Sequence, residues 1–482
     1  MDQGKLSRRR FGSLMTALLG QGMLGAAVDV KNATAQDRDR FGGWKGKRFE
    51  ATGYFRVEKE DRWWLVTPEG HAFLSFGINH LHSDLWKQAY NRKAWQERLG
   101  VDDLDDYGRF APALRSWFLK TCKDFGFNTI GVHTSLPVVN RPQPAMPYMR
   151  PIRFVDVPHW RSAIPDDNFL DVFSNAFAAH CDRLAKETAE PLRDDPFLLG
   201  YSMTDCPLFT EEDCRERTDV IGGARRPSRI GWPRRLRNLD ASAPGKQAYV
   251  RLMQELYGGR IQEFNQSYGT SFVSFDALAS AVNWRLHTDL ANVNETRDNT
   301  AFLHRVVDRY YQTARDAIRR YDPKHLFVGD KLNANTDSID TVLPVTAKYT
   351  DVVLYQMYGR YEVQKPGLDR WTQRVGKPMI NGDSAFTMIT PTMPRPYGPV
   401  ADNLEERAEW TDEFFRKAFA RPDFVGWHYC GLINAPNLIP RKQARQHSGL
   451  MDGFGKAYPL LQQVIQQASS ELYDIGSGEE HG

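Results

Sequence analysis

The chain has 482 residues, of which 41% are hydrophobic and 26% charged, and its formal net charge is +3. This composition is typical of a globular protein with a large core, and it excludes coiled-coil, collagen-like and disordered classes. Residues 1–35 hold five basic and two acidic side chains, so the excess positive charge lies there and the remainder is neutral. A neutral body argues against nucleic-acid or anionic-membrane binding, because both depend on basic surface.

Residues 1–35 are predicted to be an export signal. Ser7-Arg8-Arg9-Arg10-Phe11 resembles a twin-arginine motif, Phe11–Val28 is mildly apolar and rich in Gly and Ala, and Ala33-Thr34-Ala35 is an A-x-A cleavage sequence. A short membrane anchor is the alternative, but the glycines make this stretch too weakly apolar for hydrocarbon. We therefore expect the twin-arginine translocase as a partner during export and cleavage near Ala35. The mature protein is then periplasmic or secreted, with no stable membrane insertion.

Residues 36–70 are predicted to form a lead-in built around a β-hairpin. Phe55–Glu58 and Arg62–Val66 are strand-like runs separated by a short turn, and Thr67–Gly70 forms the next turn. The main domain is expected to follow over residues 71–470, with a flexible tail at 471–482.

Within 71–470, short apolar runs alternate with amphipathic segments. The runs predict strands at 72–78, 129–133, 149–155, 198–203, 326–329, 352–357, 378–381 and 424–430. The amphipathic segments predict helices, the clearest at 111–125, 172–190, 247–268, 298–320, 405–419 and 458–468. Eight strands with intervening helices predict an α/β fold, the (β/α)8 TIM barrel. A doubly wound sheet is the alternative, but no G-x-G-x-x-G or P-loop follows any strand.

A large insertion is predicted between the fourth and fifth strands. Residues 207–243 are polar and rich in Arg, and residues 265–295 contain a separate unit. Loops that leave the carboxyl ends of barrel strands build the rim of the active site. The arginine run 225–238 is predicted to be a solvated loop, with contact to an acidic substrate as the alternative.

Polar residues at the ends of the predicted strands are the candidate functional residues, because barrel enzymes carry their active sites there. Those that we expect to contact a substrate are Asn79, His80, His133, Asp330, Lys331, Gln356, Tyr358, Trp427 and Tyr429. These strand ends offer no cysteine–histidine or serine–histidine nucleophile arrangement, and the five cysteines are expected to be buried or incidental thiols.

The segment His80-Leu81-His82 resembles the metal motif of amidohydrolase barrels. That chemistry also requires histidines from strands five and six and an aspartate from strand eight. These strands offer Asp330, Gln356 and His428 instead. We therefore expect no metal and no cofactor, and a metal-dependent hydrolase is a less favoured alternative.

Several motifs resemble those of a known family. The segment Tyr54–Asn79, with Arg62-Trp-Trp-Leu-Val-Thr-Pro-Glu-Gly-His71 and Ser75-Phe-Gly-Ile-Asn79, is similar to the lead into the barrel of agarase-like glycoside hydrolases, which include the family 50 β-agarases. Lys377-Pro-Met-Ile-Asn-Gly-Asp383 and Gly426-Trp427 resemble motifs of the wider clan of retaining barrel glycosidases. The resemblance implies cleavage of a glycosidic bond in a polysaccharide or oligosaccharide, with an agar-type β-linkage as the first choice. The clan uses an acid/base glutamate after strand four and a nucleophilic glutamate after strand seven.

The chain departs from this pattern at both catalytic positions. The matching residues are Asp205, as general acid, and Asp383, as nucleophile or base. Aspartate is one methylene shorter than glutamate, so the choice between retaining enzymes, with carboxyls about 5–5.5 Å apart, and inverting enzymes, at about 6.5–9.5 Å, stays open. The alternatives are that Glu211, Glu212 or Asp330 takes one of the two roles, or that the barrel binds carbohydrate without catalysis.

The resemblance also implies roles for other strand-end residues. Tyr358 matches the clan's strand-six tyrosine and is expected to hold Asp383. From their residue type alone, His133 and His80 suit hydrogen bonds to sugar hydroxyls. Trp427 and Tyr429 are candidates to stack on a sugar ring. We expect only one of these two aromatic side chains to point into the barrel.

Overall fold

The computed structural model of the chain describes most of its length. The described residues are 37–135, 144–155, 170–207, 209, 231–282, 284–285, 289, 291–336, 338–391, 393–435 and 447–478. The predicted export signal and two alternative carboxylates, Glu211 and Glu212, lie outside these residues.

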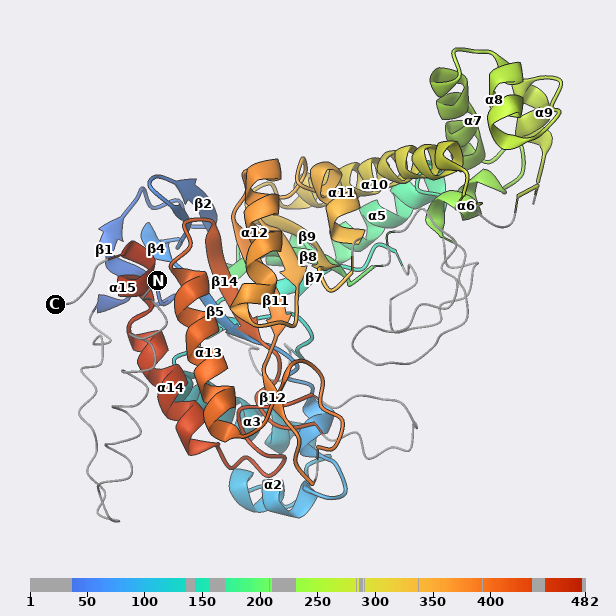
Figure 1. Cartoon of the computed structure of the whole chain (residues 1–482). Coiled ribbons are helices and arrows are strands. Elements are labelled where there is room, and N and C mark those ends of the chain that lie inside the picture. The colour runs from blue at the N-terminus through green and yellow to red at the C-terminus, as the bar shows by residue number, and fades with distance from the viewer. Residues whose placement is uncertain are drawn as a thin grey trace, which may run out of the picture.

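A closed barrel of eight parallel strands forms the centre of the molecule (Figure 1). In chain order the strands are β5 (Ser75–Ile78), β6 (Thr129–Ile130), β7 (Tyr148–Pro151), β8 (Leu198–Asp205), β9 (Leu326–Asn333), β10 (Val353–Gln356), β11 (Met379–Ser384) and β14 (Phe424–Tyr429). Pairing of β14 with β5 closes the ring. Each strand overlaps one predicted run, so the (β/α)8 fold is confirmed. The strands are buried on both faces, which is why the sequence shows continuous apolar runs there.

Helices cover the outside of the barrel. They are α2 (Arg92–Leu99), α3 (Tyr107–Phe125), α5 (Asn175–Thr188), α10 (Val293–Tyr321), α11 (Ser338–Thr346), α12 (Tyr361–Val375), α13 (Leu404–Phe419) and α14 (Pro459–Ser470). The prediction missed α11 and α12, because Pro344 and Pro366 lie inside them and proline normally signals a helix end. None of the described helices is long and apolar enough to cross a membrane.

A four-stranded antiparallel sheet precedes the barrel. Its strands are β1 (Trp44–Arg48), β2 (Arg56–Lys59), β3 (Trp63–Val66) and β4 (His71–Phe73), in the order β1-β4-β3-β2. The pair β2–β3 is the predicted hairpin. The run predicted as one strand over 72–78 is divided between this sheet and β5. Buried Arg62 ties the sheet to the barrel, because its guanidinium donates to the carbonyls of Phe419, Phe424 and Gly476.

The end of the chain differs from the expected flexible tail. Residues Leu472–Ser477 form the helix α15, in which Leu472 and Tyr473 are buried. The Tyr473 hydroxyl donates a 2.6 Å hydrogen bond to the carbonyl of Gly42. This helix therefore packs against the first described residues, as part of the folded body.

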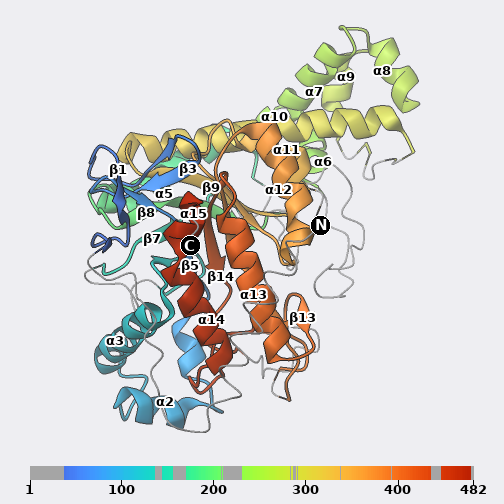
Figure 2. The ribbon, with the colours of Figure 1, turned by 60° about the vertical axis from the view of Figure 1, so that its left-hand side comes forward.

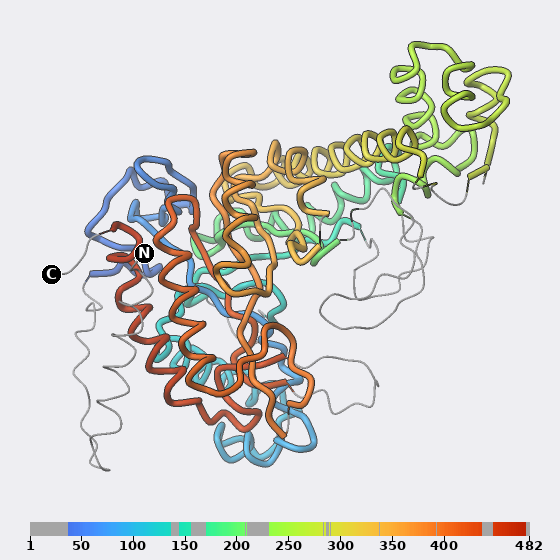
Figure 3. Tube along the Cα trace, viewed as in Figure 1, coloured from blue at the N-terminus to red at the C-terminus, as the bar shows by residue number. Residues whose placement is uncertain are grey.

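The insertion between β8 and β9 forms a helical arm. It contains α6 (Trp232–Arg237), α7 (Pro244–Leu256), α8 (Ile261–Tyr268) and α9 (Phe275–Ser280). Figures 1 and 2 show α7, α8 and α9 at the far end of α10, away from the barrel, and the trace in Figure 3 follows the chain back along α10. The single helix predicted over 247–268 is two helices. Gly258 and Gly259 adopt left-handed backbone, with φ 57° and 74°, between them.

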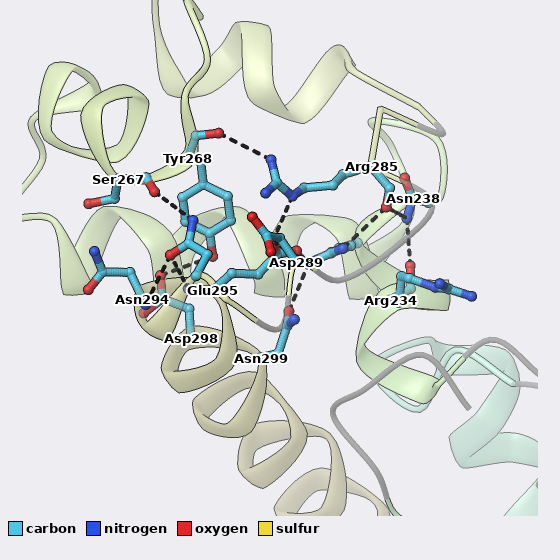
Figure 4. A network of polar contacts seen from close by, with 12 residues as sticks. Arg234, Asn238, Ser267, Tyr268, Arg285, Asp289, Asn294, Glu295, Asp298 and Asn299 are labelled. Carbon is cyan, nitrogen blue, oxygen red and sulfur yellow. Dashed lines mark hydrogen bonds and ion pairs between the residues drawn. The ribbon is translucent and has the colours of Figure 1, made fainter. Parts of the chain in front are cut away.

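A buried polar network joins the arm to α10 (Figure 4). Arg237 is fully buried and lies 3.0 Å from Glu295 Oε1, and Arg285 lies 2.7 Å from Glu295 Oε2. The Tyr268 hydroxyl donates to Asp298 Oδ2 at 3.0 Å. The prediction of a solvated arginine loop is therefore wrong for Arg237, whose charge holds the arm in place. Residues 225–230 of that run lie outside the described part.

Candidate active site

The carboxyl end of the barrel brings Asp205, Asp383 and Lys331 into contact. Lys331 Nζ lies 3.0 Å from Asp205 Oδ1 and 2.7 Å from Asp383 Oδ2. The side chains of Lys331 and Asp383 are 2% and 1% exposed, whereas that of Asp205 is 22% exposed. One ammonium group thus bridges the two carboxylates that the sequence singles out.

Strand alternation decides which residue of β9 reaches this site. Neighbouring residues on a strand point to opposite faces. Lys331 points inward, so Asp330 faces α10, where its Oδ1 accepts hydrogen bonds from the Thr204 N–H at 2.8 Å and the Tyr310 hydroxyl at 3.2 Å. Burial raises the pKa of Asp330 to about 7. Contrary to the expectation that both residues contact substrate, Asp330 lies behind the strand.

Lys331 and Asp383 hold each other in their charged forms. Burial by itself lowers the pKa of Lys331, but Asp205 and Asp383 outweigh burial and raise this pKa above its ordinary value. Burial by itself raises the pKa of Asp383, but Lys331 and then His80 outweigh it and hold this pKa well below its usual range. At neutral pH, Asp383 is therefore a carboxylate and Lys331 an ammonium.

Two histidines flank the bridged carboxylates. His133 Nε2 lies 2.9 Å from Lys331 Nζ and 3.4 Å from Asp205 Oδ1, and His80 Nε2 lies 3.3 Å from Asp383 Oδ2. Their rings are stacked, with centroids 4.8 Å apart. Burial, and after it the Lys331 charge, lowers the pKa of His133 to about 4. His133 is thus neutral at pH 7, and its Nε2 accepts a hydrogen bond from Lys331.

The backbone around the site adopts an uncommon conformation. Among the described residues, the non-glycine residues with left-handed φ are His80 (55°), His133 (60°) and Cys206 (47°). All three follow barrel strands, and Cys206 comes directly after Asp205. Such conformations cost about 1–3 kcal/mol each and persist where the surrounding structure enforces them, commonly at functional sites.

Asn79 holds Asp383 in place. This residue is fully buried, and its Nδ2 donates to the carbonyl of Gly382 at 2.6 Å and to Asp383 Oδ1 at 3.3 Å. A side chain fixed in this way orients the carboxylate. The structure therefore gives Asn79 a positioning contact beneath Asp383.

Two further expected residues lie at the ends of their strands. Gln356 is fully buried at the end of β10, and its amide atoms have no hydrogen-bond partner among the described residues. The ring of Tyr358 packs 4.6 Å from that of Tyr397. Tyr358 and Asp383 both interact with the Cys430 thiol, so Tyr358 lies in the neighbourhood of Asp383.

The aromatic residues of β14 face away from the site. Trp427 packs 4.8 Å from Phe414 of α13, and the Tyr429 hydroxyl accepts a hydrogen bond from Arg407 of the same helix. The expectation that one of these two rings points inward is wrong, because residues two apart on a strand share a face. His428 between them points inward, and burial lowers its pKa to about 3. Neither Trp427 nor Tyr429 is placed to stack on a sugar.

The sequence analysis missed a second group of residues at the barrel mouth. Cys430 Sγ lies 3.2 Å from His447 Nδ1, and the His447 ring stacks on His80 with centroids 4.3 Å apart. Cys430 directly follows β14, so its place at a strand end was a usable signal. His447 lies far along a connecting segment and offered none.

A pocket of about 260 Å³ opens beside Asp205. Besides Asp205, its polar lining includes His82, His133, Arg153 and Lys331. The basic side chains of this lining surround a carboxylate that is partly exposed. The pocket therefore gives small polar molecules access to Asp205, whereas Asp383 lies deeper.

No family model matches the chain. β-Agarase A and β-agarase B of Vibrio sp. (strain JT0107) are 22% and 21% identical to it over 86% and 83% of its length. The chain is similar to β-agarases. It spans 45% and 46% of these two proteins, or about half of each.

Solved agarase structures have the same fold as this agarase-like chain. An exo-β-agarase superposes with a TM-score of 0.73 at 17% identity, covering 98% of this chain and 71% of that one. A second agarase gives a TM-score of 0.71 at 18% identity, covering 99% and 71%. The agarase-like resemblance and the barrel fold inferred from the sequence are thus confirmed.

Proposed function

We propose that the chain is a glycoside hydrolase that cleaves an agar-type β-linkage, with Asp205 as general acid and Asp383 as nucleophile. The observation that carries this proposal is the pair of carboxylates at the ends of β8 and β11, which face each other across Lys331. The similarity to β-agarases supports the substrate class. His80 and His133, each 13% exposed, are the proposed donors and acceptors for sugar hydroxyls.

The spacing of the carboxylates favours a retaining mechanism. The facing oxygens of Asp205 and Asp383 lie 3.0 and 2.7 Å from one nitrogen, so they cannot be farther apart than the sum of these distances. That sum is below the minimum of about 6.5 Å for inverting enzymes. We therefore propose that Asp383 attacks the anomeric carbon directly and does not act through a water molecule.

In the proposed mechanism, the Lys331 ammonium lies where the reaction would develop positive charge, between Asp205 and Asp383. Two carboxylates already stabilise its ammonium there, and the same field stabilises an oxocarbenium-like transition state. The sugar ring can reach Asp383 only after the ammonium has left the gap, and the same movement frees Asp205 to take up the proton that a general acid must carry. Until then, Lys331 keeps Asp383 ionised, which a nucleophilic carboxylate requires.

A non-catalytic carbohydrate-binding barrel is the second candidate function. The observation that favours it is the same bridge, because the ammonium pairs with both carboxylates and Asp383 is only 1% exposed. A barrel that never releases this bridge would bind sugar without cleaving it. Assays of binding and of product formation separate the two functions.

The decisive experiment compares Asp205→Asn and Asp383→Asn on two substrates. On agarose oligosaccharides, Asp205→Asn is expected to lose about 10²–10⁴-fold in turnover, because general acid catalysis typically contributes that much. On an aryl galactoside, whose leaving group needs little protonation, the same variant is expected to lose much less. Asp383→Asn is expected to fail on both substrates.

Asp330→Asn is the matched control, because Asp330 is as buried as Asp383 and lies at the same end of the barrel but faces α10. It is expected to retain turnover on both substrates. Near-native turnover of a folded Asp205→Asn or Asp383→Asn protein would remove that residue from the mechanism. Binding of the oligosaccharide without any product from the wild-type chain would establish the binding barrel instead.

We also propose that Arg8 and Arg9 direct export by the twin-arginine route, giving a periplasmic or secreted protein. The support is the motif and the A-x-A sequence that ends at Ala35. Replacing both arginines by lysine is expected to leave the uncleaved precursor in the cytoplasm, as cell fractionation would show. Replacing Lys5 by arginine is the control. Normal export of the double variant would exclude this route.

A further inference from the structure

We propose that His80, Cys430 and His447 bind a zinc ion at the mouth of the barrel. One donor atom of each residue lies within 4.8 Å of those of the other two. The residues come from three separate parts of the fold: after β5, after β14, and from the segment that leads to α14. A thiol and two imidazoles are the side chains that zinc prefers.

The distances between donor atoms are close to those of a zinc site. Tetrahedral zinc, with its usual bond lengths, holds nitrogen and sulfur ligands about 3.3–3.6 Å apart. Cys430 Sγ and His447 Nδ1 are already 3.2 Å apart. The rings of His80 and His447 lie face to face with an interplanar angle of 30°. Because an imidazole binds a metal through the lone pair in its ring plane, the proposed site forms when the His80 ring turns out of this stack and directs a nitrogen towards Cys430 Sγ and His447 Nδ1.

The neighbouring carboxylate orients His80 for this role. Zinc-bound histidines usually donate their second ring N–H to a carboxylate or carbonyl, which fixes the ring and its tautomer. His80 Nε2 faces Asp383 Oδ2 at 3.3 Å, so Nδ1 is the nitrogen left for a metal. Asp383 is thereby the outer partner of a carboxylate–histidine–zinc arrangement, in which both nitrogens of His80 are engaged and the contacts to sugar hydroxyls fall to His133.

The charges of the surrounding groups also fit a divalent cation. Asp205 and Asp383 contribute two negative charges, and Lys331 cancels one of them. Zinc binding displaces the proton of Cys430 to solvent and forms a Zn–S bond, which adds a further negative charge. With neutral histidines, these residues carry a net charge of −2, which one zinc ion balances.

Three protein ligands leave a fourth position open, as in zinc sites that bind water or a substrate oxygen. The Tyr397 ring stacks on that of His447, with centroids 5.8 Å apart. This ligand set differs from the amidohydrolase set, which needs histidines from strands five and six. Its existence does not depend on the proposed hydrolase activity.

The test measures metal content directly. The purified chain is stripped with a chelator, incubated with zinc chloride, separated from loose metal by gel filtration and analysed by mass spectrometry of the metal. A single zinc ion per chain is expected. Cys430→Ala and His447→Ala are each expected to weaken zinc binding by more than about 10-fold, since loss of even an outer-shell partner costs about 10–100-fold.

Matched controls are Cys181→Ser and His304→Ala, which lie on α5 and α10 away from this group. Both are expected to retain zinc. Substitution with cobalt provides a second readout, because wild type is expected to show a sulfur-to-cobalt charge-transfer band that Cys430→Ala lacks. The proposal is overturned if wild type binds no zinc, or if folded ligand variants bind it as tightly as wild type.

Discussion

Replacing Asp330 by asparagine is expected to change how the stability of the barrel depends on pH. Burial raises the pKa of Asp330 to about 7 in the folded chain, against 3.8 ordinarily. Between pH 3.8 and about pH 7, the Asp330 carboxyl keeps its proton in the folded state but has lost it in the unfolded chain. Asp330 therefore contributes stability that is fully present below the unfolded pKa and is lost as pH rises through the folded one. A difference of about three pKa units corresponds to roughly 4 kcal/mol.

Urea unfolding followed by tryptophan fluorescence would measure this effect. Between about pH 4.5 and 8, the free energy of unfolding of Asp330→Asn is expected to rise by roughly 3 kcal/mol relative to wild type, because most of the titration lies in this range. Asparagine adds its own pH-independent cost, since it brings an amide N–H₂ into a buried site. Asp402→Asn, at an exposed position, is the control. A constant difference between Asp330→Asn and wild type across this range would refute the reasoning.

Three further predictions concern buried groups. Lys331→Met is expected to lower the free energy of unfolding by about 3–5 kcal/mol in urea, because Asp383 is left as an uncompensated buried charge. Adding Asp383→Asn is expected to restore most of this stability, and a double variant as unstable as Lys331→Met would contradict the pairing. Trp427→Ala is expected to cost about 3–5 kcal/mol in the same assay while leaving the Kd for an agarose oligosaccharide unchanged, since this ring faces α13. Arg237→Met removes the partner of buried Glu295 and is expected to speed amide hydrogen exchange in α7, α8 and α9, while exchange in the barrel strands stays as in wild type.

The barrel was predictable because each of its strands is a local feature of the sequence. Strands buried on both faces appear in the sequence as short apolar runs, and these runs can be recognised without knowing which strands pair. Two of the helices that were missed, α11 and α12, contain proline, which normally signals the end of a helix. The arm was recognised as an insertion, but the burial of Arg237 was not predictable, because its partner Glu295 lies 58 residues away.

The candidate site was predictable in part, for a related reason. Position at a strand end correctly marked Asp205, Lys331 and Asp383 as neighbours in space. Which of two adjacent residues faces inward depends on the phase of the strand, and neither Asp330 nor Trp427 could be assigned from type alone. The sequence around His447 shows neither helix nor strand periodicity, so the place of His447 at the site could not be predicted.

The left-handed residues at the barrel mouth have a consequence for any attempt to engineer the chain. His80, His133 and Cys206 together store roughly 3–9 kcal/mol of backbone strain, which is comparable with the whole net stability of a typical domain, about 5–15 kcal/mol. Glycine in place of His80 or His133 relaxes the backbone and removes a proposed functional side chain in the same step. A search for thermostable variants that scores melting temperature alone would therefore select substitutions that stabilise the barrel but remove side chains from the candidate active site.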